Sequence, residues 1–198
     1  MTAETAPEVR AVSTRWILTG LFVLAAVAAV IALEASSLNR DARLASVDLL
    51  LLAVLAWPLA HTDIREHRLP DDYTYPLMAG TFAAHATAAL FSRDPAYLTG
   101  SLLGGGFLTL FYILLTFFGG AGLGDAKLVA SLGAGASLGG PLAVAGILAL
   151  SSVLALPHAL TKLRAPRSER HVPFGPYLIA AGLIILGTTI TTQTMGAL

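Results

Sequence analysis

Two aspartates in this sequence stand in short polar segments that each border a long apolar run. Asp63 lies within His61–Asp72, and Asp125 follows the glycine-rich residues 119–124. Carboxylates bordering apolar, membrane-type runs are energetically expensive and are therefore candidates for function. When two carboxylates lie close together, like charge prevents both from ionising, so one keeps a proton. Such a pair could hydrolyse a peptide bond, with one acid activating water and the other polarising the carbonyl, without a metal or a cofactor.

Each polar segment also has a structural interpretation. Asp71 or Asp72 could cap the helix that follows, because a carboxylate accepts hydrogen bonds from free backbone N–H groups. Asp125 could likewise be an N-cap, and Lys127 could extend its ammonium group toward the membrane surface. The glycines before Asp125 do not have the P-loop spacing, so phosphate binding is not expected.

A third segment stands where the last apolar run begins. It reads Val172-Pro173-Phe174-Gly175-Pro176-Tyr177-Leu178. By itself it indicates only a helix entry at a membrane interface, where proline and aromatic residues are common.

Other hydrolytic chemistries lack their signatures. The sequence contains no cysteine, which excludes thiolate nucleophiles, zinc-thiolate sites and disulfides. No Gly-x-Ser-x-Gly segment occurs, and the histidines have no HExxH spacing, so no metal site is expected. The five histidines are at positions 61, 67, 85, 158 and 171.

The composition is that of a membrane protein. Of its 198 residues 56% are hydrophobic and 12% are charged, against about a quarter charged in soluble domains. Lipid is therefore an expected partner. The formal net charge is zero, and no basic cluster favours nucleic acid as a partner.

The length of the apolar runs predicts an all-α polytopic bundle with six to seven transmembrane helices. A crossing takes about 20 helical residues, and six runs approach that length, namely residues 16–33, 44–60, 74–91, 97–118, 142–160 and 174–192. Residues 126–138 are too short to cross lipid alone. Glycines 104–106 and the small residues 133–136 permit close helix packing. We therefore expect residues 126–138 to form a short helix enclosed by the others.

The orientation follows from Lys162, Arg164, Arg167 and Arg170, which crowd one loop that the positive-inside rule assigns to the cytoplasm. Counting crossings backward assigns Asp63 and Asp125 to the cytoplasmic face as well, together with the segment beginning at Pro173. Residues 34–43 and 92–96 then face outward. Asp48 lies toward that outer side, so no catalytic role is assigned to it. The first apolar run is long enough to be an uncleaved anchor.

Together the three segments resemble the type IV prepilin peptidase family, the bacterial branch of the GxGD membrane aspartic proteases. Its first catalytic aspartate precedes a Leu/Ile-Pro-Asp/Asn segment, which resembles Asp63 followed by Leu69-Pro70-Asp71. Its second lies in Gly-x-Gly-Asp-x-Lys-Leu, which here is Gly122-Leu123-Gly124-Asp125-Ala126-Lys127-Leu128. The similarity returns at Pro173-Phe174-Gly175-Pro176 and covers roughly residues 44–186. Three motifs in the same order are more specific than any one alone.

The resemblance implies an aspartic endopeptidase of the bacterial inner membrane that removes the short basic leader of prepilins or pseudopilins at the cytoplasmic face. Asp63 and Asp125 would be catalytic, with no metal and no cofactor. The supporting residues would be Gly122, Gly124, Lys127, Leu69, Pro70, Asp71, Pro173, Phe174, Gly175 and Pro176. Residues 44–198 would form the protease domain, preceded by a tail, a first helix and an external loop in residues 1–43. The pilin system served and the oligomeric state are undetermined.

One departure from the family is the absence of the tetra-cysteine domain of its longer members, which also methylate the new pilin terminus. We therefore expect cleavage without methylation. Two other classes explain parts of the sequence. A small transporter could use broken glycine-rich helices and buried acids, although its site would lie near the membrane midplane. A purely structural subunit would leave the two aspartate motifs unexplained.

Overall fold

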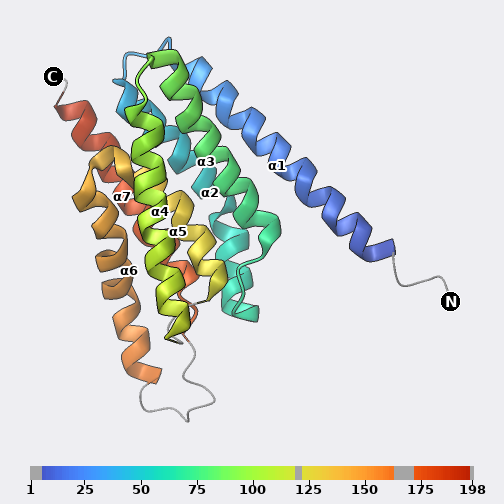
Figure 1. Ribbon diagram of the computed structural model, residues 1–198. Coiled ribbons are helices and arrows are strands. Elements are labelled where there is room, and N and C mark those ends of the chain that lie inside the picture. The colour runs from blue at the N-terminus through green and yellow to red at the C-terminus, as the bar shows by residue number, and fades with distance from the viewer. Residues whose placement is uncertain (1–5, 119–121, 163–171, 197–198) are drawn as a thin grey trace.

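The computed structural model describes residues 6–118, 122–162 and 172–196 as a bundle of helices (Figure 1). Within these ranges there is no strand, so the expected all-α class is confirmed. The helices are α1 (Ala6–Leu33), α2 (Arg40–Glu66), α3 (Asp71–Ser92), α4 (Ala96–Phe117), α5 (Leu123–Ala136), α6 (Pro141–Lys162) and α7 (Gly175–Met195), with one turn of 3₁₀-helix at Ser137–Gly139.

Five of the described helices are long and apolar enough to cross a membrane, namely α1 from Arg15 onward, α2, α4, α6 and α7. The α3 helix is also 22 residues long, but it is not apolar enough to be counted with these five. Its sequence includes the buried polar residues Thr74, Thr81 and His85. These side chains are tolerated because α3 packs against α1, α2, α4 and α5, so its surroundings are mainly protein.

The short helix α5 is enclosed by its neighbours, as expected. Its 14 residues extend about 21 Å, less than the roughly 30 Å of the hydrocarbon core. Residues 128–136 are all buried. Close contact with α4 requires glycine on both sides, because a Cβ atom on Gly104 would lie 2.4 Å from the carbonyl oxygen of Gly133. Gly106 has no such neighbour within 4 Å, so not every glycine of α4 serves this contact.

The helix ends near Asp63 and Asp125 differ from the expected ones. The α2 helix continues through the polar run to Glu66 and ends where His67 adopts a left-handed conformation with φ 49°. The α3 helix begins after Pro70 without a side-chain cap, so neither Asp71 nor Asp72 is its N-cap. Gly122 is the N-cap of α5. Asp125 therefore lies inside the first turn and is not the N-cap.

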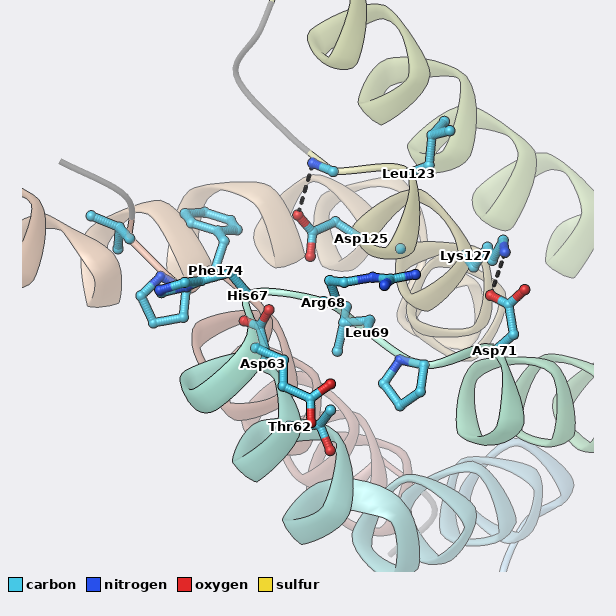
Figure 2. A pocket seen from close by; sticks show the side chains of 16 residues that line it. Thr62, Asp63, His67, Arg68, Leu69, Asp71, Leu123, Asp125, Lys127 and Phe174 are labelled. Carbon is cyan, nitrogen blue, oxygen red and sulfur yellow. Dashed lines mark hydrogen bonds and ion pairs between the residues drawn. The ribbon is translucent and has the colours of Figure 1, made fainter. Parts of the chain in front are cut away.

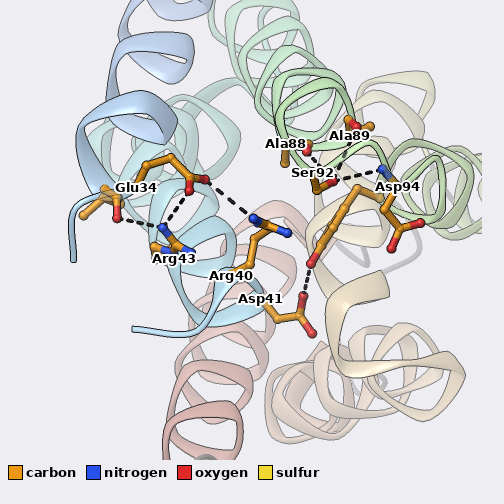
Figure 3. Close-up of polar contacts among 10 residues, drawn as sticks. Glu34, Arg40, Asp41, Arg43, Ala88, Ala89, Ser92 and Asp94 are labelled. Atoms are coloured by element: carbon orange, nitrogen blue, oxygen red, sulfur yellow. Dashed lines mark hydrogen bonds and ion pairs between the residues drawn. The ribbon is translucent and has the colours of Figure 1, made fainter. Parts of the chain in front are cut away.

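The opposite end of the bundle neutralises its own charges (Figure 3). Arg43 donates to a carboxylate oxygen of Glu34 at 3.0 Å, and Arg40 lies 4.0 Å from the other oxygen. Asp41 instead accepts a hydrogen bond from the Tyr97 hydroxyl at 2.8 Å. Glu34, and not Asp41, is thus the acidic partner of these two arginines.

Candidate active site

The three polar segments meet in one pocket of about 670 Å³ at the end of the bundle. Its lining comes from the end of α2, the connection to α3, the start of α5 and residues 172–174. Figure 2 shows Asp63 on α2 and Asp125 on α5 in this lining. The two aspartates are 62 positions apart in the sequence, so tertiary packing brings them to the same pocket.

Asp63 is held in place by the start of α7. It is 5% exposed, and its Oδ2 atom accepts a hydrogen bond from the backbone N–H of Gly175 at 2.9 Å. A Cβ atom at position 175 would lie 2.8 Å from the same oxygen. Glycine at this position therefore permits the backbone to approach the carboxylate and to donate to it.

Asp125 lies in the first turn of α5 and is half-buried. Its Oδ2 atom accepts a hydrogen bond from the backbone N–H of Gly122 at 3.2 Å. The positive end of a helix dipole favours a carboxylate at this position. The preceding residue, Gly124, packs directly on Leu69, because a Cβ atom on Gly124 would lie 2.9 Å from the Leu69 Cβ atom. The segment that contains Asp125 thus packs against the segment that follows Asp63.

Asp71 and Lys127 form an ion pair that joins α3 to α5. The Lys127 ammonium group also lies 4.8 Å from the centroid of the Tyr75 ring. From α1, Arg15 approaches the second carboxylate oxygen of Asp71 at 4.0 Å. The pair is partly exposed, because 31% of the Lys127 side chain and 42% of the Asp71 side chain are accessible. Its contribution to stability is therefore about 0–1 kcal/mol. Lys127 therefore has a protein partner, and the sequence had not indicated Arg15 as a neighbour of the pocket.

An aromatic cluster lies behind Phe174, which lines the pocket. The Phe174 ring centroid is 6.5 Å from that of Tyr112 and 6.4 Å from that of Tyr177. The Tyr177 hydroxyl lies 2.8 Å from Nδ1 of His158. Tyr112 was not singled out from the sequence, because it lies in an uninterrupted apolar run and only its burial and its contact with Phe174 distinguish it.

Most of the supporting residues expected from the sequence contact the pocket. Gly175 contacts Asp63 directly, whereas Pro176 is the second residue of α7 and does not line the pocket. His67 lines it, but His61 instead packs 5.8 Å from the Trp57 ring centroid. The remaining expected residues that line it are Leu69, Pro70, Asp71, Gly122, Gly124, Lys127, Pro173 and Phe174.

The described lining is rich in charge. Glu66 joins the carboxylates of Asp63, Asp71 and Asp125, whereas the permanent cations there are Arg68 and Lys127. Among the described residues, no group of three or more histidine and acidic side chains is arranged to hold a metal ion.

A second buried acid lies far from this pocket. Asp48 is 3% exposed, and its Oδ2 atom is 2.9 Å from Nε2 of the fully buried His85. Nδ1 of His85 lies 3.2 Å from the carbonyl oxygen of Tyr97. Asp48 precedes Asp63 by 15 positions on α2, which corresponds to about 22 Å along the helix. These contacts of His85 link α2, α3 and α4.

Comparison with known proteins identifies the family of this chain. Residues 49–160 match the type IV leader peptidase family (Peptidase_A24), which covers more than half of the chain. The chain is also 35% identical over 149 residues to a prepilin leader peptidase/N-methyltransferase from Aeromonas hydrophila. No solved structure matches it significantly. The fold is a bundle of membrane-type helices, and the pocket at one end is lined by residues of the Asp63 and Asp125 motifs. Together with the family match, these features define the class of protein. The chain belongs to the type IV leader peptidase family.

The match to the curated relative is partial in length. It covers 72% of this chain and 50% of the relative, so the chain spans about half the length of that protein. The family match includes Asp63, Asp125 and the Asp71–Lys127 pair, but it ends before Phe174 and Gly175. The contact between Gly175 and Asp63 thus joins a residue outside the matched range to one inside it.

Proposed function

We propose that this protein is a membrane aspartic endopeptidase that removes the leader peptide from prepilins or pseudopilins. The observation that carries the proposal is the presence of Asp63 and Asp125 in the lining of one pocket at the end of the helix bundle. Membership of the leader peptidase family supports the substrate class.

In the proposed reaction a water molecule attacks the carbonyl carbon of the scissile peptide bond. One of the two carboxylates accepts a proton from the water while the other, protonated, donates a hydrogen bond to the carbonyl oxygen. The carbon–nitrogen bond then breaks, and the leaving amine takes up a proton. The backbone N–H of Gly122 donates a hydrogen bond to Asp125, and the N–H of Gly175 donates one to Asp63. These bonds orient both carboxylates.

The other residues of the pocket would orient the peptide and the two acids. Leu69 supports Gly124 and hence the turn that carries Asp125. Lys127 and Asp71 connect the same turn to α3. We assign residues 44–198 to the protease domain. The preceding helix α1 packs along α3, and its Arg15 approaches Asp71.

We expect the purified full-length chain, reconstituted with a prepilin, to release the leader at one bond. Intact-mass analysis of the pilin measures this directly, and it should show a single product shortened by the leader. The control is the same prepilin in vesicles without the protein. Uptake of solutes by the vesicles without leader cleavage would instead favour a transporter.

We further propose that the pocket faces the cytoplasm in the bacterial inner membrane. The proposal rests on the basic loop at residues 162–170, which the positive-inside rule assigns to the cytoplasm. Counting membrane crossings along the sequence assigns the pocket residues to the same side as this loop. Residues 163–170 lie outside the described structure.

The orientation predicts that residues at the two ends of the bundle differ in labelling. Because the chain contains no cysteine, Glu66→Cys at the pocket and Asp94→Cys at the opposite end provide single thiols. In intact cells a membrane-impermeant thiol reagent should label position 94 and should label position 66 only after the membrane is opened. Labelling of position 66 in intact cells would show that the pocket faces outward.

A further inference from the structure

An apolar groove of about 420 Å³ lies between α4 and α6, away from the pocket that contains the two aspartates. In Figure 1 these helices run side by side with α5 behind them. The floor is formed partly by Gly100, where even a Cβ atom would make only an ordinary contact with Ser137 at 3.6 Å. We call this hollow the α4–α6 groove. Its walls include Leu103, Phe107, Pro141, Val144 and Ala145.

A row of exposed apolar side chains runs along α4 from the groove toward the end of the bundle that holds the pocket. Three large side chains of α4 and that of Phe118, the residue directly after it, fall within a narrow arc when placed at 3.6 residues per turn. Their exposures are 75% for Leu103, 56% for Phe107, 50% for Leu114 and 86% for Phe118. We call them the α4 stripe, and it extends about 22 Å along the helix. It ends four positions before Gly122, which lines the pocket.

One residue of the pocket lining is an exposed apolar side chain. Leu123 is 63% exposed, whereas Leu69 on the other wall is 7% exposed. Among the described lining residues, Leu123 is the large aliphatic side chain that is mostly uncovered. Leu123 follows Phe118, the last residue of the α4 stripe, by five positions in the sequence.

We infer that the α4 stripe and the α4–α6 groove bind the apolar helix of the substrate that follows the cleaved bond. The inference rests on the proposed function, because a leader peptidase substrate must pass from the pocket into the membrane. A crossing helix of about 20 residues is about 30 Å long, which is enough to follow the stripe and reach the groove. The small residues of the groove allow a helix backbone to approach closely.

The first test is cysteine cross-linking in membranes. The absence of native cysteine permits single thiols at Phe107→Cys and Ala145→Cys in the groove. The controls are Leu50→Cys and Val54→Cys, which are on α2 and are 60% and 66% exposed before substitution. The probe is a prepilin with one cysteine placed at successive positions of its apolar helix. Disulfide formation should be several-fold higher with the groove thiols and should recur every three to four substrate positions.

Cleavage measured in the same membranes separates this inference from the proposed function. Cleavage with cross-links no stronger at the groove than on α2 would overturn the groove assignment and leave the peptidase assignment intact. Selective cross-links without cleavage would support the groove and contradict the peptidase. Neither cleavage nor selective cross-links would contradict both.

The second test fills the groove. Ala145 is exposed in its wall, so Ala145→Trp occupies space that the substrate helix would use. We expect KM for the full-length prepilin to rise about tenfold, the loss expected of weakened binding at unchanged kcat. A short soluble peptide containing the cleavage site but no apolar helix should be cleaved at the wild-type rate, which also reports correct folding. Ala53→Trp, at an exposed alanine of α2, is the matched control. An unchanged KM for Ala145→Trp would overturn the inference.

Discussion

Asp63→Asn and Asp125→Asn should each abolish leader cleavage. Asparagine preserves the volume and can still accept the hydrogen bonds from Gly175 and Gly122, but it cannot exchange a proton. Loss of general acid–base catalysis alone costs about 10²–10⁴ in rate. Residues that act as one unit are not additive, so the double variant should be little slower than either single variant. Initial rates on a prepilin, at equal amounts of folded protein, measure this effect.

Two other Asp→Asn substitutions serve as controls for this prediction. Asp48→Asn keeps a hydrogen-bonding side chain beside His85 far from the pocket, and Asp94→Asn alters an exposed loop at the opposite end. Both should retain most of the activity. If Asp63→Asn or Asp125→Asn, correctly inserted, cleaved prepilin near the wild-type rate, the two-aspartate mechanism would be wrong.

Gly175→Ala should lower the cleavage rate by at least tenfold without preventing folding. The added Cβ atom would lie 2.8 Å from Oδ2 and 3.1 Å from Cγ of Asp63, so the carboxylate or the start of α7 must move. A displacement of about 1 Å in a catalytic site can cost about 10² in rate. Overpacking of this kind also costs about 1–3 kcal/mol of stability. The measurements are kcat on a prepilin and thermal unfolding of the purified variant.

Gly187→Ala is the matched control because it introduces the same methyl group on the same helix, where no atom lies within 4 Å of the added Cβ. It should leave both cleavage and unfolding close to wild type. Equal activity of the Gly175→Ala and Gly187→Ala variants would mean that the contact between Gly175 and Asp63 does not position the carboxylate.

The short helix α5 could be predicted because the length and composition of its sequence do not suit a helix that faces lipid. Residues 126–138 are too short for lipid and too rich in glycine and alanine to pack with large side chains, so enclosure by other helices was the expected solution. Lengths of apolar runs depend only on neighbouring residues, and for that reason α2, α3, α4, α6 and α7 were also located to within several residues at their ends. The α1 helix begins at Ala6, ten positions before its apolar run. The α2 helix is longer than the predicted range of residues 44–60, because the polar residues through Glu66 remain helical.

The contacts of the aspartates with distant residues could not be predicted in the same way. Asp71 has two competing partners, the backbone N–H groups of its own helix and the ammonium group of Lys127, which is 56 positions away. Local sequence contains only the first of these, which is why a helix cap was the structural alternative considered for Asp71. The same limit applies to α3, whose polar residues appear unfavourable for a lipid-facing helix until the surrounding helices are known.

The sequence by itself determined the membrane class, the approximate helices and the two aspartate motifs, because apolar length and residue type are local properties. Only the tertiary structure decided which backbone group holds each carboxylate and how tightly. Gly175 donates to Asp63 across 112 positions of sequence, and Gly124 rests on Leu69 across 55. Such contacts depend on the packing of α2, α5 and α7 against one another. Their geometry exists only after the bundle has formed.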